Sequence, residues 1–145
     1  MDNSQTDDLI EDSPENYPGF DDLLREIFPE CYPNDTYRDH CPDDSKWVIK
    51  SKDGVIIAFC NYYFTGRKNH LILSNVGVNP AYRRQGHAKS MIKSIIEKFS
   101  SNHEILLHVK KGNKPGKKLY TGLGFNLNAS LMAPVKGEQW YRYAK

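Results

Sequence analysis

The residues best suited to chemistry lie in one short basic stretch, from Arg83 to Lys89. It follows an apolar, strand-like run and comes directly before a helix-like segment, so unpaired N–H groups of the helix N-terminus point into it. Gly86 lets the backbone approach an anion closely, and the arginines add formal charge. The stretch therefore predicts a phosphate-binding loop. A solvated basic turn is the alternative, since neither the G-x-x-x-x-G-K-S/T nor the G-x-G-x-x-G pattern is present.

The elements around this stretch indicate a mixed α/β domain. Apolar residues recur at helical spacing from Ala88 to Phe99, the most regular pattern in the chain. A hairpin turn is predicted at Asp53-Gly54, because this pair readily adopts positive φ. The other expected elements are a helix at 20–28 ended by Pro29, strands at 47–52, 55–64, 70–78, 104–110, about 131–135 and 139–144, a helix at 115–123, and a loop with room for one short helix at 31–44. The strand–helix–strand order makes the 70–78 and 104–110 strands parallel neighbours.

Two stretches resemble the GNAT superfamily of N-acetyltransferases. Val76 to Ala88 is similar to its acetyl-CoA signature, Q/R-x-x-G-x-G/A, with the upstream V-x-V-x-P-x-Y-R approach. Asn113 to Phe125 is similar to its N-x-x-A/G-x-x-L-Y-x-x-x-G-F block. The resemblance covers about residues 19 to 145 and implies a single GNAT-type domain there. It implies a mixed, mostly antiparallel sheet flanked by helices, whose two central parallel strands splay apart at the acetyl-CoA site.

The resemblance also implies the activity and the residues that carry it. An acetyl-CoA-dependent N-acetyltransferase without a metal is expected, in which the amine attacks the thioester directly. Tyr120 occupies the position of the family's general acid, and a core tyrosine beside Leu119 is the alternative. A backbone N–H at about Val76 would polarise the thioester carbonyl. The residues implied to bind the cofactor are Val76, Gly77, Val78, Arg83, Arg84, Gln85, Gly86, His87, Ala88, Lys89 and Asn113.

The general base is where the chain departs from the family pattern. Many members place Glu on the strand before the V-x-V run, and this chain has Leu73-Ser74-Asn75 there. Ser74 cannot serve as that base. The alternatives are ordered water, His70 at the start of the strand, or an acidic residue of the first third of the chain.

The distribution of charge bears on the acceptor. Residues 1–45 carry fourteen carboxylates and two arginines, a net −12, whereas residues 46–145 carry a net +14. The basic part coincides with the two cofactor stretches. The acidic part, with Trp140, Tyr141 and Tyr143, suits a cationic amine, so a polyamine or similar small amine is expected. A protein lysine or N-terminal amine is the runner-up, and a non-catalytic acyl-CoA-binding module is a further alternative.

Composition supplies the remaining expectations. Residues 1–18 are acidic and poor in apolar residues, which predicts a disordered tail before the domain at 19–145. No membrane span, secretory leader or nucleic-acid motif is expected. Cys31, Cys41 and Cys60 fit a reducing, cytoplasmic location, and their spacing does not indicate a metal site. The expected partners are acetyl-CoA and the amine, and a homodimer is compatible with these features.

Overall fold

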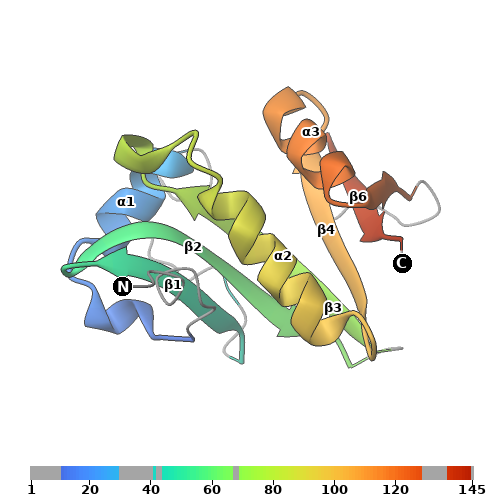
Figure 1. Cartoon of the computed structure of the whole chain (residues 1–145), viewed down its shortest axis with the longest axis horizontal. Coiled ribbons are helices and arrows are strands. Elements are labelled where there is room, and N and C mark those ends of the chain that lie inside the picture. Colours follow the sequence, from blue (N-terminus) through green and yellow to red (C-terminus); the bar gives the residue numbers. More distant parts are fainter. Residues whose placement is uncertain (1–10, 30–40, 42–43, 67–68, 129–136, 145) are drawn as a thin grey trace, which may run out of the picture.

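The fold is built on one mixed, six-stranded sheet (Figure 1). A computed structural model describes residues 11–29, 41, 44–66, 69–128 and 137–144. The strands follow the order β1-β2-β3-β4-β6-β5, with bounds β1 (Lys46–Lys52), β2 (Val55–Phe64), β3 (His70–Val78), β4 (Glu104–Lys110), β5 (Phe125–Leu127) and β6 (Glu138–Tyr143). Neighbouring strands are antiparallel except β3 and β4, which are parallel. The predicted fold class is therefore confirmed.

Helices cover both faces of this sheet. On one face, α2 (His87–Phe99) packs its apolar side, and α3 (Lys114–Gly122) adds partly buried residues to the same cluster. On the other face, α1 (Phe20–Ile27) packs through Phe20 and Leu24. Successive residues of β1 contribute to both clusters, Val48 to the α2 side and Trp47 and Ile49 to the α1 side, because side chains alternate along a strand. None of the described helices is long and apolar enough to cross a membrane.

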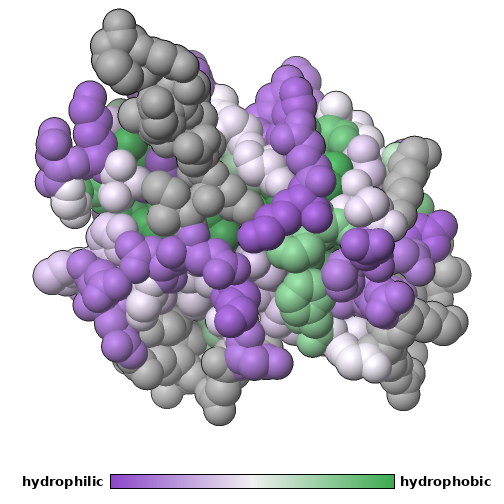
Figure 2. Space-filling model, turned by 60° about the horizontal axis from the view of Figure 1, so that its bottom comes forward, coloured by the Kyte–Doolittle hydropathy of each residue, from purple (hydrophilic) through white to green (hydrophobic). Residues whose placement is uncertain are grey.

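The surface is mainly polar outside these clusters. Figure 2 shows a face on which hydrophilic side chains surround a narrow strip of apolar ones. Among the described residues, the large apolar side chains that are exposed are those of Val55, Phe64 and Leu127. Most of the apolar side chains in the described part of the chain therefore stabilise the two clusters on the sheet.

The predicted hairpin is confirmed at Asp53-Gly54, where φ is 53° and 80°. Two positive φ values in succession match a tight two-residue turn. The predicted helix at 115–123 is present one residue earlier, as α3. The expected strand near 131–135 and most of the loop at 31–44 lie outside the described residues. The short strand β5 was not predicted.

The acidic segment 1–18 was expected to form a tail, but its second half contacts the sheet. Glu11 pairs with Val48 of β1, and its carboxylate accepts a hydrogen bond from Tyr62 Oη at 2.6 Å. The Tyr17 hydroxyl donates to the Asp12 carboxylate at 2.7 Å, and this bond lowers the pKa of Asp12. A 3₁₀ turn, η2 (Pro14–Asn16), then leads into α1. Residues 11–18 thus contact the domain, and residues 1–10 lie outside the described residues.

The parallel strands β3 and β4 separate part way along their length. Their paired residues end with Ile72 and Leu106, although β3 runs on to Val78 and β4 to Lys110. The two strands therefore open toward their C-terminal ends, as expected for the central pair of this sheet. Side chains from both strands can reach the space between them.

A bulge in β3 lies where it leaves β4. On the β2 side, Phe59 pairs with Gly77 and Asn61 with Ser74, so β3 has one residue more than β2 over this interval. Asn75 takes up the extra length with a φ of 48°. A bulge bends its strand and takes a residue out of the hydrogen-bond ladder. The local geometry of β3 thus contributes to the opening beside β4.

Candidate active site

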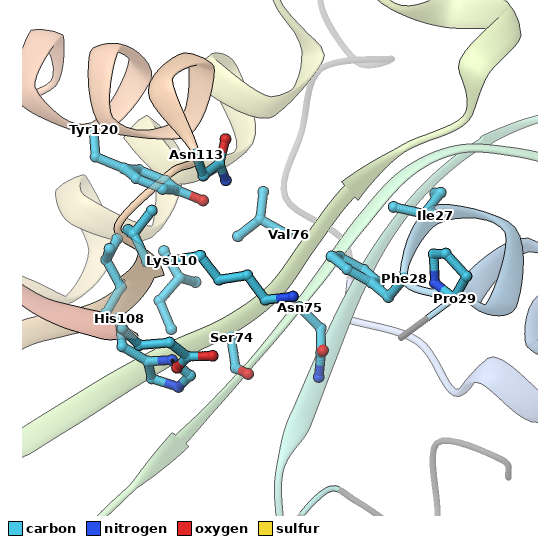
Figure 3. A pocket seen from close by; sticks show the side chains of 14 residues that line it. Ile27, Phe28, Pro29, Ser74, Asn75, Val76, His108, Lys110, Asn113 and Tyr120 are labelled. Atoms are coloured by element: carbon cyan, nitrogen blue, oxygen red, sulfur yellow. Dashed lines mark ion pairs between the residues drawn. The ribbon is translucent and has the colours of Figure 1, made fainter. Parts of the chain in front are cut away.

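A cavity of about 320 Å³ lies between the separated ends of β3 and β4 (Figure 3). Its described walls come from the end of α1, from β3 and β4, from the first residue of β6, and from Asn113 and Tyr120 at α3. A volume of this size is at the lower end of the range for small-molecule sites. The cavity is therefore large enough for the thioester end of a cofactor and a small reacting group.

The predicted phosphate loop joins β3 to α2 through a 3₁₀ turn, η4 (Pro80–Tyr82). Gly86 is the N-cap of α2 with a φ of 79°, and no atom lies within 4 Å of the position a Cβ would take. The backbone at the start of α2 is thus accessible, and its first N–H groups have no acceptor within the helix. Four of the other predicted loop residues are exposed, namely Arg83, Arg84, Gln85 and Lys89. The remaining two, His87 and Ala88, are half-buried. This arrangement suits a pyrophosphate.

The three predicted cofactor residues on β3 differ in their surroundings. Val76 lines the cavity, whereas Gly77 and Val78 are not among its described walls. Gly77 is buried against Phe59, and a Cβ at Gly77 would lie 2.6 Å from a ring atom of Phe59. Packing against Phe59 therefore explains why this position is a glycine.

Asn113 lines the cavity from the start of α3. It is the N-cap of that helix, and its side-chain oxygen accepts a hydrogen bond from the Gly116 N–H at 3.0 Å. A Cβ at Gly116 would lie 2.6 Å from Asn113 Nδ2, so the glycine leaves room for the capping side chain. The cap fixes the amide and leaves its nitrogen as a donor.

Tyr120 is half-buried on α3, with its ring edge against Phe125 and the ring centres 6.1 Å apart. Figure 3 shows its hydroxyl pointing into the cavity, beside Asn113. Burial raises the pKa of Tyr120 to about 12, with a further contribution from Cys60, in place of the value near 10 expected from the sequence. A thiol has a pKa of about 8.5, so full proton transfer from this phenol to a thiolate is uphill. The geometry favours Tyr120 as a hydrogen-bond donor to the leaving sulfur.

A histidine–carboxylate pair lies in the same cavity. His108 Nδ1 is 2.5 Å from a carboxylate oxygen of Glu138, and the two side chains are 28% and 14% exposed. His108 is on β4 and its ring packs against the Trp140 ring at an angle of 77°, with centres 5.3 Å apart. Nδ1 is thus the ring nitrogen next to the carboxylate, and Nε2 is the one farther from it.

Neither residue of this pair was predicted. His108 gave one signal, a histidine inside an otherwise apolar strand. Glu138 gave none, because it reaches the cavity only through the pairing of β6 with β4, in which it lies opposite Lys110. Such a pair depends on sheet register between segments about thirty residues apart, which the sequence did not supply.

The base candidates from the sequence lie elsewhere or outside the described residues. His70 is at the closed end of the β3–β4 pair, 3.6 Å from a carboxylate oxygen of Glu104, and is not among the described walls of the cavity. Ser74, which the sequence excluded as the base, does line the cavity. The acidic residues of α1, which are Asp21, Asp22 and Glu26, are not among the described walls of the cavity. Other acidic residues of the first third lie outside the described residues, namely Glu30, Asp35, Asp39 and Asp43.

The described part of the chain contains no group of three or more His, Cys, Asp or Glu side chains placed to hold a metal ion. The groups that line the cavity include an imidazole, a phenol, amides and backbone groups. These groups can accept one proton, donate hydrogen bonds and hold a developing negative charge.

Comparisons with known sequences indicate the family of the chain. The model of the acetyltransferase (GNAT) family matches residues 17–125. Over 56 residues the chain is 34% identical to the ribosomal protein bS18-alanine N-acetyltransferase of Haemophilus ducreyi, a stretch that covers 37% of this chain and 39% of that protein.

Solved structures share the fold. An aminoglycoside 6′-acetyltransferase type Ii is similar with a TM-score of 0.75 and 15% identity, over 93% of this chain and 95% of that chain. A GNAT family acetyltransferase from Elizabethkingia anophelis with acetyl-CoA bound has a TM-score of 0.68 and 14% identity, over 94% of this chain and 96% of that chain. With the family match over most of its length, the chain belongs to the GNAT family and is an acetyl-CoA-dependent N-acetyltransferase.

Proposed function

We propose that the protein acetylates the N-terminal α-amino group of a protein or peptide, with His108 as the general base and Tyr120 as the donor to the leaving sulfur. The observation that carries this proposal is the His108–Glu138 pair in the cavity that Tyr120 also lines. One cavity thus offers a base for the amine and a donor for the thiolate.

The reaction follows from these groups. His108 Nε2 accepts a proton from the ammonium group, and the neutral nitrogen attacks the thioester carbon. Collapse of the tetrahedral intermediate breaks the C–S bond, and Tyr120 donates a hydrogen bond to the departing sulfur. The bulge at 75–76 takes one residue out of the ladder, which supports a backbone N–H near Val76 as donor to the carbonyl oxygen. The protons released from the amine pass through His108 to solvent or to the thiolate.

An α-amine suits a single imidazole base better than an alkyl amine does. An α-amine has a pKa of about 7.9, so its deprotonation at pH 7 costs about 1 kcal/mol. An alkyl amine of pKa about 10.4 costs about 4.6 kcal/mol under the same conditions. A single imidazole next to a carboxylate can therefore deprotonate an α-amine more easily than an alkyl amine.

The acceptor side of the cavity supports the same choice. Ile27, Phe28 and Pro29 give it an apolar wall at the end of α1, which suits a small apolar side chain at the start of a peptide. Among the described residues that line it, Glu138 is the one carboxylate, and that carboxylate contacts His108. Lys110 also lines the cavity and repels a second positive charge. A polyamine brings such a second charge.

The partial match to a ribosomal protein bS18-alanine N-acetyltransferase supports an N-terminal acceptor, since that relative is named for acting on alanine. A cationic small amine, such as a polyamine, is the second candidate. It is favoured by the net charge of −12 over residues 1–45 and by the shared fold with an aminoglycoside 6′-acetyltransferase.

An acceptor panel tests the proposal, with thiol release giving the rate and mass spectrometry the modified atom. One peptide carries a free N-terminal alanine and blocked lysines, and its matched control has a blocked N-terminus and one free lysine. Spermidine and an aminoglycoside complete the panel. We expect acetylation of the first peptide, at its α-nitrogen. Transfer to spermidine or the aminoglycoside but not to that peptide would replace the proposal with the second candidate, and transfer to the lysine peptide alone would contradict both.

A further inference from the structure

Lys50 is a lysine buried in the sheet, with 6% of its surface exposed. It lies on β1, two residues after Val48 and on the same face, which α2 covers (Figure 1). Burial of an ammonium group costs several kcal/mol before compensation by hydrogen bonds. An apolar residue would pack here at no such cost, so the position suggests a role for the charge.

The described contacts of Lys50 lead to the phosphate loop. Its Nζ lies 3.3 Å from His87 Nδ1 and 3.3 Å from Ser90 Oγ, both in the first turns of α2. His87 Nε2 in turn lies 3.2 Å from Gln85 Oε1. Polar contacts therefore connect β1 with the loop in the order Lys50, His87, Gln85.

The direction of these hydrogen bonds follows from the groups involved. An ammonium group has three donors and no acceptor, so His87 Nδ1 must accept. The hydrogen of the neutral ring then sits on Nε2, which donates to Gln85 Oε1. This fixes the tautomer of His87 and the orientation of the Gln85 amide, whose nitrogen remains a donor.

We propose that Lys50 is a positioning residue for the pyrophosphate of acetyl-CoA. Through His87 and Gln85 it holds the 83–89 loop in its anion-binding conformation, and its ammonium group adds a positive charge that solvent screens weakly. The cations of the loop, Arg83, Arg84 and Lys89, are exposed and are therefore more strongly screened by solvent and salt. The positive end of the α2 dipole disfavours an ammonium group nearby, and a bound pyrophosphate offsets that repulsion.

Calorimetric titration with CoA and with dephospho-CoA tests this inference, and neither titration needs an acceptor amine. Lys50→Met removes the charge and keeps an apolar stem, and Lys46→Met removes the same charge from the exposed start of β1. We expect Lys50→Met to weaken binding of both ligands about tenfold, because both carry the pyrophosphate, and to leave the apoprotein's Tm no lower. We expect the Lys46→Met protein to bind as the wild type does. Unchanged affinity in Lys50→Met, or equal losses in the two variants, would overturn the proposal.

Two further measurements separate positioning from a general effect on folding. Nitrogen-15 NMR should show His87 as the Nε2–H tautomer in the wild-type protein and as a mixture in Lys50→Met. Gln85→Ala alters an exposed side chain, so it tests the same contacts if Lys50→Met does not fold, and we expect it to weaken CoA binding severalfold. A mixture of His87 tautomers in the wild-type protein, or unchanged CoA binding in Gln85→Ala, would contradict the proposal that Lys50 acts through His87 and Gln85.

Discussion

The cofactor side and the acceptor side of this site are built in different ways. The cofactor side uses one continuous run, Arg83 to Lys89, in which the positive φ of Gly86 exposes the backbone at the start of α2. The acceptor side uses side chains from α1, β3, β4 and β6, from Ile27 to Glu138 in sequence. A backbone site depends on conformation, whereas a side-chain site depends on which groups are present. Substitutions on the two sides should therefore separate cofactor affinity from turnover.

His108→Gln should have the largest effect, a fall in kcat of about a hundredfold or more with an unchanged Kd for CoA. A glutamine keeps hydrogen-bonding capacity but cannot accept the proton from the amine, and a general base contributes about 10²–10⁴-fold. Initial rates at saturating acetyl-CoA, together with titration of CoA, measure both quantities.

His70→Gln is the matched control, because His70 also contacts a carboxylate, Glu104, but at the closed end of the strand pair. We expect it to leave kcat within a factor of two or so of the wild-type value. A large loss in His70→Gln and none in His108→Gln would place the base at the closed end of the β3–β4 pair instead.

Tyr120→Phe should lower kcat by at least about tenfold and leave the Kd for CoA nearly unchanged. The substitution removes the hydroxyl and keeps the ring that packs on Phe125. Tyr143→Phe is the control, since Tyr143 packs on the same Phe125, with ring centres 5.7 Å apart, and is not among the described walls of the cavity. Equal rates in Tyr120→Phe and wild type would remove Tyr120 from the mechanism.

The raised pKa of Tyr120 adds a pH criterion to this test. A phenol loses its donor when it deprotonates, and with a pKa of about 12 Tyr120 stays protonated through pH 10. A plot of kcat against pH should thus show no fall below pH 10 that arises from Tyr120. A falling limb near pH 9 that disappears in Tyr120→Phe would show that the pKa is lower than burial implies.

The same contrast explains which parts of the molecule were predictable. Helix α2 and the β1–β2 hairpin follow from residues close in sequence, the apolar spacing from Ala88 to Phe99 and the Asp53-Gly54 turn. The phosphate loop is equally local, so its residues were identified as a group. Strand β5 is three residues long, too short to show a period, and was missed.

The acceptor side was not predictable, because its groups meet only after the sheet has formed. His108 and Glu138 come together through the antiparallel register of β4 and β6. The two residues lie on different strands and have no fixed spacing within one element, so the sequence indicated ordered water, His70 or an acidic residue of the first third as the base instead. The contacts of Glu11 with Val48 and Tyr62 were missed for the same reason.

Gly77→Ala should affect stability and not cofactor binding. The new methyl group would lie 2.6 Å from a ring atom of Phe59, a side chain with 0% exposure that has little room to move. Overpacking of this kind costs about 1–3 kcal/mol. Thermal unfolding should show a lower Tm, and titration should show an unchanged Kd for CoA. A weakened Kd at unchanged Tm would instead support Gly77 as a cofactor-binding residue, as the family resemblance implied.

Gly86→Ala should affect cofactor binding and not stability, and its effect should be smaller. We expect the Kd for CoA to rise severalfold and Tm to change little. No atom lies within 4 Å of the added methyl group, so packing does not oppose it. The φ of 79° does oppose the substitution, because the left-handed conformation costs an L residue about 1–2 kcal/mol of conformational free energy. Such a residue shifts toward negative φ where it can. In an exposed loop that shift moves the backbone N–H groups at the start of α2 and spares the core. If Gly86→Ala instead lowers Tm as much as Gly77→Ala and leaves Kd unchanged, the cofactor side does not depend on backbone conformation, and the contrast between the two sides of the site fails.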